Sequence, residues 1–100
     1  MNMKLESTIP TPHSDVHYSL LDKEAVLLNL NDGVYHSLNP LGTTIWTLCD
    51  GIRSLQDILE SVCSQYDVQE EIAKQDLLQL MTRLNQEGLV EFRSEPGVTN

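Results

Sequence analysis

The first half of the chain carries three short stretches whose apolar residues suit strands rather than helices. Residues 16–21 read Val-His-Tyr-Ser-Leu-Leu, and residues 24–30 and 34–38 flank Asn31-Asp32-Gly33. A turn sequence of this kind between two apolar stretches is a strong β-hairpin signal. The pattern therefore predicts three strands, the second and third joined by a tight turn.

The loop length of this hairpin decides which side chains share a face of the sheet. A two-residue loop pairs Leu30 with Tyr35, whereas a three-residue loop, with its glycine in the left-handed position, shifts the pairs by one residue. The longer loop gathers more aliphatic side chains on one face, as a half-buried sheet requires, so we predict the bulged three-residue loop. Its pairs are Leu30 with Val34, Leu28 with His36 and Val26 with Leu38.

Helical periodicity replaces the strand pattern after residue 38. Asn39 followed by Pro40 is a good start signal, because Asn caps a helix and Pro at the first position lacks only an N–H that would be unpaired anyway. This helix is predicted to end near Asp50, with Gly51 after it. A second helix opens at Ser54 with a capping-box pattern, and its apolar residues recur at helical spacing. They are Leu55, Ile58, Leu59, Val62, Cys63 and Tyr66.

The third predicted helix is the longest, and it runs from near Asp67 to Glu87 before Gly88. Leu78 lies about 60° beyond its core stripe on a helical wheel, so it either widens the core contact or lines a groove. A short apolar segment, residues 89–92, follows as a strand or docking segment. The core stripe consists of Ala73, Leu77, Leu80, Met81 and Leu84.

Three strands followed by three helices predict one α+β domain, and the glycines near the helix turns also suit a helix-turn-helix core. Residues 1–14, with two prolines and little to bury, are expected to be a flexible tail. Residues 94–100 are expected to be a second flexible tail, which leaves residues 15–93 as the folded domain.

Acidic residues are spread along the whole chain, where 15 Asp and Glu against 6 Lys and Arg give a net charge of −9. Binding of DNA or RNA requires a basic face that displaces counterions from phosphates, so this composition argues against nucleic acid. No window reaches the ~20 apolar residues of a membrane span, and the N-terminus lacks a signal-peptide core. We therefore expect a cytoplasmic protein without a membrane partner.

No catalytic motif is present in the sequence, since it has no nucleophile elbow, no phosphate-binding glycine loop and no His-Glu-x-x-His. Cys49 and Cys63 lie on the apolar sides of predicted helices and are expected to be reduced core thiols. The histidines His13, His17 and His36 lie in the expected tail and on two strands, so only His17 and His36 could meet across the sheet, and a metal site needs more than two ligands. We expect no enzyme activity, no metal and no cofactor.

The segment Val34–Leu38 contains no proline, lysine or charged residue, so nothing protects it if it lies at a sheet edge. A peptide could then add to it as a further strand, with main-chain hydrogen bonds giving affinity and side-chain pockets giving specificity. The alternative is a central strand that needs no protection, because sequence alone does not fix strand order. Residues 16–21 are the other candidate for the free edge.

One long motif connects these features. It runs from Leu28 to Gly42, Leu-Asn-Leu-Asn-Asp-Gly-Val-Tyr-His-Ser-Leu-Asn-Pro-Leu-Gly, and continues with Ile45-Trp46, Asp50-Gly51 and residues 84–90, Leu-Asn-Gln-Glu-Gly-Leu-Val. This pattern resembles the PqqD-like family over roughly residues 16–92. Members of quinone cofactor synthesis usually carry Pro-Glu where Asn-Asp-Gly stands here, so the chain is more similar to the free-standing members of lasso peptide pathways.

The resemblance implies a winged-helix-like fold, with a three-stranded antiparallel sheet followed by a three-helix bundle. It implies that the leader peptide of a ribosomally made precursor binds antiparallel to the third strand, against the third helix. The domain would then deliver the precursor to a separate leader peptidase or modifying enzyme. The implied peptide-binding residues are Val34, Tyr35, His36, Ser37 and Leu38 on the strand, and Asp76, Leu77, Leu78, Met81 and Arg83 on the helix.

Three alternatives compete with this function. The first is a PqqD-type chaperone that presents a precursor to a radical SAM enzyme in quinone cofactor synthesis. The second is a DNA-binding winged helix, but its reading helix would be acidic, with four acids and two bases over residues 68–87. The third is a dimerisation module that pairs the same bare edge with a second copy of itself.

Overall fold

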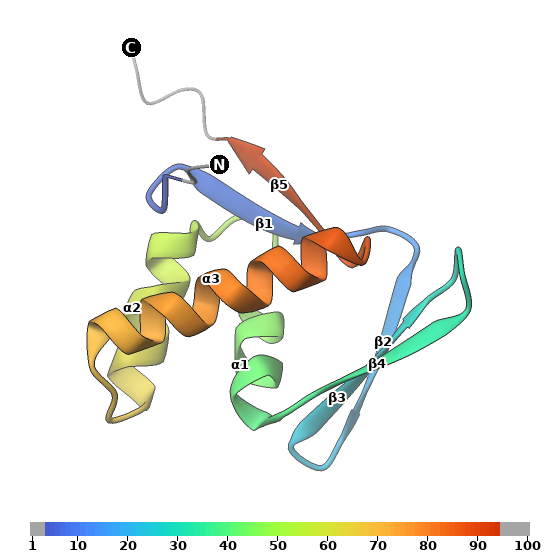
Figure 1. Ribbon diagram of the computed structural model, residues 1–100, viewed down its shortest axis with the longest axis horizontal. Coiled ribbons are helices and arrows are strands. Elements are labelled where there is room, and N and C mark those ends of the chain that lie inside the picture. The colour runs from blue at the N-terminus through green and yellow to red at the C-terminus, as the bar shows by residue number, and fades with distance from the viewer. Residues whose placement is uncertain (1–3, 95–100) are drawn as a thin grey trace.

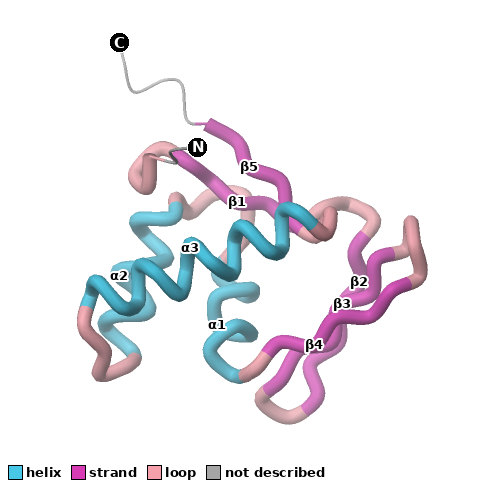
Figure 2. The backbone as a smooth tube through the Cα atoms, viewed as in Figure 1, coloured by secondary structure: helices cyan, strands magenta, loops and turns pink. Residues whose placement is uncertain are grey.

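The computed structural model describes residues 4–94, in which strands precede and follow a group of helices (Figure 1, Figure 2). The strands are β1 (Thr8–Pro12), β2 (Val16–Leu21), β3 (Glu24–Asn29), β4 (Val34–Leu38) and β5 (Val90–Ser94). The helices are α1 (Pro40–Leu48), α2 (Leu55–Gln65) and α3 (Glu70–Gln86). The predicted α+β class, with a three-stranded antiparallel sheet followed by three helices, is confirmed.

The first and last strands, β1 and β5, form a separate two-stranded antiparallel sheet. The expectation of a flexible tail over residues 1–14 is therefore wrong for β1, in which Ile9 is only 4% exposed. The partner of β1 lies at the other end of the chain, so no local pattern reveals the pairing. The expected second tail also begins too early, because Ser94 belongs to β5. The remainders of both expected tails, residues 1–3 and 95–100, lie outside the described residues.

The three-stranded sheet has the order β2–β3–β4, so β4 is an edge strand and β2 is the other edge. The predicted hairpin register is wrong. The loop has four residues, 30–33, although Gly33 does adopt the predicted left-handed conformation, with φ 72°. The observed pairs are Asn29 with Val34, Leu28 with Tyr35, Leu27 with His36, Val26 with Ser37 and Ala25 with Leu38.

This register decides which side chains of β3 enter the core. Ala25 and Leu27 have no exposed surface, whereas Val26 and Leu28 are only half-buried on the opposite face. Side chains alternate between the faces of a strand, so a shift of one residue exchanges the two sets. The number of aliphatic side chains favours Val26 and Leu28 for the core face, but the small side chain of Ala25 is the one that is completely buried there.

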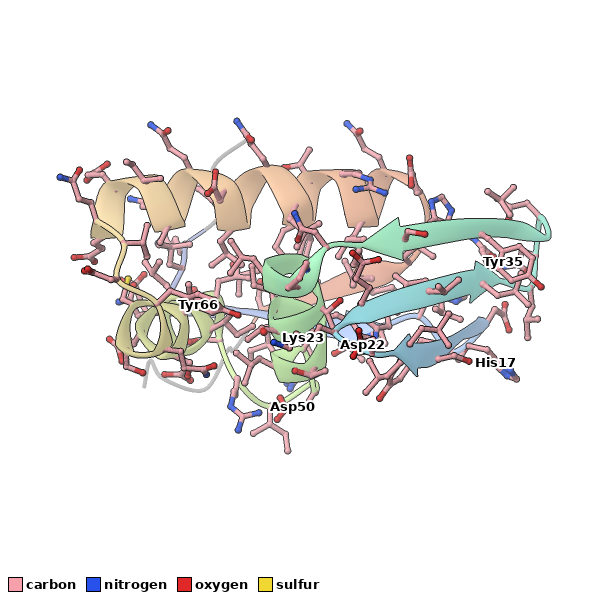
Figure 3. All side chains as sticks on the ribbon, turned by 90° about the horizontal axis from the view of Figure 1, so that it is seen from below. His17, Asp22, Lys23, Tyr35, Asp50 and Tyr66 are labelled. Carbon is pink, nitrogen blue, oxygen red and sulfur yellow. The ribbon has the colours of Figure 1, made fainter. Side chains whose placement is uncertain are left out.

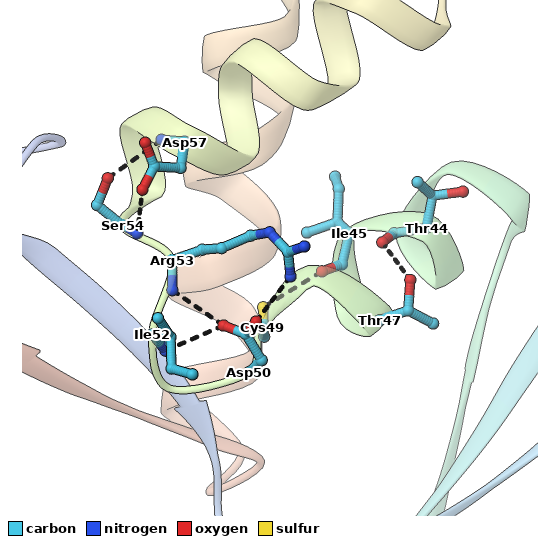
Figure 4. A network of polar contacts seen from close by, with 9 residues as sticks. All are labelled: Thr44, Ile45, Thr47, Cys49, Asp50, Ile52, Arg53, Ser54 and Asp57. Atoms are coloured by element: carbon cyan, nitrogen blue, oxygen red, sulfur yellow. Dashed lines mark hydrogen bonds and ion pairs between the residues drawn. The ribbon is translucent and has the colours of Figure 1, made fainter.

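α1 and α2 begin at the capping residues predicted for them, whereas α3 does not. The Asn39 side chain accepts a hydrogen bond from Gly42 N–H at 2.7 Å, and Pro40 takes the first helical position as predicted. Ser54 and Asp57 form the reciprocal capping box at the start of α2 (Figure 4). The predicted start near Asp67 is wrong, because α3 begins at Glu70 without a side-chain cap.

α1 packs against β3 and β4, and the three helices, this sheet and β5 contribute to a single core. Tyr18 of β2 and Trp46 of α1 meet edge to face across this junction, with ring centroids 5.7 Å apart. The largest completely buried side chains come from the sheet, all three helices and β5. They include Leu27, Ile45, Leu55, Ile58, Leu77, Met81, Leu84 and Val90.

Candidate functional site

The backbone of β4 is hydrogen-bonded on one side only. Two hydrogen bonds at the end of β3 show which way its backbone groups turn. Asn29 C=O accepts from Gly33 N–H in the turn that leads to β4, whereas Leu30 N–H donates to Asp15 C=O on the opposite side, next to β2. Since the groups of an antiparallel strand turn alternately to its two neighbours, the odd-numbered residues of β3 face β4. The polar groups of Val34, His36 and Leu38 therefore turn toward β3.

The same alternation turns the N–H and C=O groups of Tyr35 and Ser37 outward, away from the sheet. A buried hydroxyl supports this assignment, because Thr43 Oγ1 accepts from Ala25 N–H at 2.8 Å on the β4 side of β3. No strand among residues 4–94 pairs with this outer edge. β4 therefore offers two donors and two acceptors to a further strand.

A groove of about 440 Å³ lies beside this edge, between the end of β4 and α3. Figure 3 shows β4 as the strand of the sheet nearest to α3. The start of α1 forms one end of the groove through Leu41 and Gly42. The residues that line it are Ser37, Leu38, Asn39, Leu41, Gly42, Asp76, Leu80 and Arg83. A strand added to β4 would therefore place side chains against α3.

The wall that α3 contributes differs from the expected one. Leu77 and Met81 are 1% and 0% exposed, so they belong to the core and have no surface for a peptide to touch. Leu78 does not line the groove but a second hollow on the surface of α3, with Gln79, Thr82, Gln86 and Arg83, of which only Arg83 also lines the groove. Leu80 was assigned to the core stripe, but it is half-buried and provides the apolar part of the groove wall.

Charged residues of α3 complete this wall. Asp76 and Arg83, both expected at the site, line the groove on either side of Leu80. Arg83 also approaches Glu87, with Nε 3.9 Å from Oε1. Glu87 in turn contacts His36 of β4, so a chain of polar groups joins α3 to the edge strand.

The expected site residues on β4 divide between the two faces of the strand. Leu38 is 3% exposed and His36 is largely covered, both on the core face. Val34 lies on the same face of the strand, but it is next to the hairpin turn and is half exposed. Its N–H donates to Asp32 Oδ1. Tyr35 and Ser37 point to the opposite face, where Tyr35 is 69% exposed.

An apolar hollow continues the groove beyond the end of β4. It has a volume of about 250 Å³ and shares Leu41 and Asp76 with the groove. Its apolar walls come from all three helices and the α2–α3 connection: Leu41, Val62, Tyr66, Val68 and Ala73. A larger hollow of about 510 Å³, lined by Ile9, Ile52 and Arg93 among others, lies at the β1–β5 sheet and includes no residue of β4.

The outer face of the β2–β3–β4 sheet carries an apolar patch among polar residues and is uncovered by any described helix (Figure 1). Leu21 and Tyr35 are 61% and 69% exposed there, and Val26 and Leu28 lie half-buried between them. Exposed apolar patches on soluble proteins mark interaction sites. The groove and this face meet at the same edge strand, β4.

The two cysteines are free thiols at the end of α1 and within α2. Cys49 is buried, and its thiol lies 3.3 Å from Ile45 C=O (Figure 4). Burial, and to a smaller extent the charge of Asp50, raises the pKa of this thiol to about 12, so it stays protonated at neutral pH. Cys63 is half-buried, and neither cysteine forms a disulfide.

Two further properties of residues 4–94 constrain the function. No group of three or more His, Cys, Asp or Glu side chains is arranged to hold a metal ion in this part of the chain. The helices found over the same residues lack the length and apolar character needed to cross a bilayer.

Comparison with known proteins gives the same picture of the fold. The family model described as coenzyme PQQ synthesis protein D (PqqD) matches residues 24–90, which include β4 and α3. TbiB1, solved in complex with the TbiA(beta) leader peptide, is 28% identical with a TM-score of 0.77, covering 81% of this chain and 94% of its own. A lasso peptide synthetase B1 complexed with the leader peptide is 24% identical with a TM-score of 0.75, covering 82% and 96%. No curated protein matches the chain.

Proposed function

The chain belongs to the PqqD family, and from this premise we propose that it binds the leader peptide of a ribosomally made precursor as an added strand on β4. The observation that carries this function is the open edge of Tyr35 and Ser37 beside the groove of α3. Strand addition supplies main-chain hydrogen bonds, and the groove receives alternate side chains of the peptide. The domain itself carries out no catalysis.

A leader peptide is the ligand that best fits the similar structures. TbiB1, the more similar of the two at 28% identity, is in complex with a leader peptide. The second structure, at 24% identity, supports the fold of this chain rather than its ligand. We propose an antiparallel orientation, in which the leader enters from the apolar hollow at α1 and leaves past Tyr35 toward the hairpin.

We further propose that the outer sheet face docks a separate leader peptidase or modifying enzyme of lasso peptide synthesis. A leader strand on β4 would extend this face by one strand, so an enzyme bound there would touch both the domain and its cargo. Asp22, Glu24 and Asp32 outnumber Lys23 at the ends of the strands around the apolar centre, which suits a partner with basic residues around an apolar patch. The face alone, about 20 Å by 15 Å from strand dimensions, is too small for a permanent dimer.

In this proposal α3 and the β3–β4 hairpin occupy the places of the recognition helix and the wing of a winged-helix domain. The charges of α3 oppose nucleic-acid binding in that arrangement. Four acids, Glu70, Glu71, Asp76 and, at its end, Glu87, face only Lys74 and Arg83. We place the binding of the precursor in the cytoplasm, where ribosomal precursors are made.

The decisive experiment is titration of the chain with a fluorescent leader peptide from a precursor encoded beside its gene, followed by anisotropy. We expect sub-micromolar affinity, with the scrambled leader as the control. Hydrogen exchange should slow at the Tyr35 and Ser37 amides when the leader binds, because these N–H groups gain partners. Absence of leader binding together with tight, strongly salt-dependent binding of duplex DNA would refute the proposal.

A further inference from the structure

A polar cluster connects the edge strand to the end of α3. His36 Nδ1 lies 2.8 Å from Glu87 Oε1, and Asn29 Nδ2 donates to Glu87 C=O at 3.2 Å. Glu87 therefore contacts both strands of the β3–β4 hairpin, with its side chain on β4 and its backbone on β3. Gly88 then turns the chain away with φ 75°, a left-handed backbone conformation that favours glycine.

The His36–Glu87 contact joins β4 to the C-terminal end of α3 next to the groove, whose lining includes Ser37 and Arg83. His36 stands between Tyr35 and Ser37, the two residues whose backbone groups are free, and Glu87 follows Arg83 by one turn along α3. α3 packs mainly on α2 and β5 rather than on β4. A change in this contact would therefore alter the separation between β4 and α3.

An imidazole is an unexpected side chain at this position if stability alone is considered. The neighbours of His36 on the core face are the completely buried Leu27 and, two residues on, Leu38. His36 Nε2 is buried and has no hydrogen-bond partner among the described residues. Because the Glu87 side chain is 41% exposed, an aliphatic residue in place of His36 would leave no buried charge without a partner. A hydrogen-bonded contact between His36 and Glu87 differs from an aliphatic contact because it fixes the distance between β4 and α3.

We propose that His36 and Glu87 are positioning residues that hold β4 and α3 at the separation required for a leader strand, without forming the binding surface themselves. The inference rests on the proposed leader-binding function. Since the peptide must bond to β4 and pack on Leu80 at once, a groove of the wrong width can satisfy only one of these contacts. Removing the contact should therefore weaken binding even where the domain stays fully folded.

The test compares four variants by leader anisotropy and by thermal unfolding. His36→Leu should melt no lower than the wild type but bind the leader about fivefold more weakly, which corresponds to one net hydrogen bond. Glu87→Ala should weaken binding by a similar factor, and the double variant no further, because both changes break one contact. Glu87→Gln, which keeps an oxygen at hydrogen-bond distance from His36, should restore most of the affinity.

Glu71→Ala is the matched control, because it removes the same side chain from the other end of α3, where it is exposed. A second readout separates positioning from local stability: the Asp76 and Leu80 amide resonances should shift in Glu87→Ala, although both residues lie far along the helix. Wild-type affinity in His36→Leu, or additive losses in the double variant, would overturn the inference. Failure of the wild type to bind the leader would instead refute the proposed function.

Discussion

The two edges of the three-stranded sheet have the same backbone chemistry and different surroundings. Tyr35 and Ser37 turn their polar backbone groups outward from β4, and by the same alternation Tyr18 and Leu20 do so from β2. Beside β4 lie the groove and α3, whereas β2 is the strand farthest from α3 (Figure 3). The strands therefore differ in the side-chain contacts that an added peptide would find.

This difference teaches why an open edge alone is a poor predictor of function. Main-chain hydrogen bonds are available to any extended peptide, so they add affinity without selecting a sequence. Selection requires a wall that meets every second side chain. Of the two edges of this sheet, the β4 edge lies beside such a wall, formed by Asp76, Leu80 and Arg83.

The strongest way to break the comparison is to block each edge in turn with proline. Ser37→Pro removes one outward N–H and places a ring where the leader backbone must approach, whereas an edge strand itself tolerates this change. We expect leader affinity to fall by about tenfold or more, from the lost hydrogen bond and the steric block together. Anisotropy with the labelled leader measures the effect.

Leu20→Pro is the matched control, because it removes an outward N–H from β2 and leaves β4 untouched. Its leader affinity should equal that of the wild type. Equal losses in both variants, at equal thermal stability, would mean that the peptide does not distinguish the edges and that the groove has no role.

The second prediction tests the wall rather than the edge, with two half-buried leucines of α3. Leu80 faces the groove and Leu78 lines the second hollow on the surface of α3. We expect Leu80→Ser to weaken leader binding about fivefold, for the loss of roughly 1 kcal/mol of apolar contact, and Leu78→Ser to leave it unchanged. The melting temperature should fall to a similar extent in both variants. A loss of leader binding in Leu78→Ser would therefore mean that Leu78 belongs to the peptide site.

Sequence patterns were sufficient for the elements that depend on nearby residues. The Asn39-Pro40 start, the Ser54–Asp57 capping box and the glycine of the hairpin are local signals, and each is confirmed. The register failed because it depends on which face of β3 the helices cover, and that contact is not local. β1 was missed for a related reason, since its strand partner among residues 4–94 is β5, at the far end of the chain.

The candidate site was predicted in outline and misplaced in detail. The strand Val34–Leu38 does lie at the edge and beside α3, as the resemblance implied. The helical wall was assigned to Leu77, Leu78 and Met81 because apolar residues on a helix look alike in sequence. Which flank faces β4 depends on the rotation of α3 in the core, and the structure brings Leu80 to the groove instead.

The smallest effects are expected for the two tyrosines of the edge strands, and they separate the sheet edge from the sheet faces. Tyr18 contacts Trp46 on the core face, so Tyr18→Ser should lower the unfolding free energy by about 1 kcal/mol. Tyr35 is 69% exposed on the outer face, so Tyr35→Ser should leave stability unchanged. Neither change removes a backbone group, and leader affinity should shift by less than about twofold in both.

Only Tyr35→Ser should slow processing of the bound precursor by its enzyme, because that side chain belongs to the proposed docking face. Equal processing rates in the two variants would remove the outer face from the function and leave the edge and groove of β4 as the whole site.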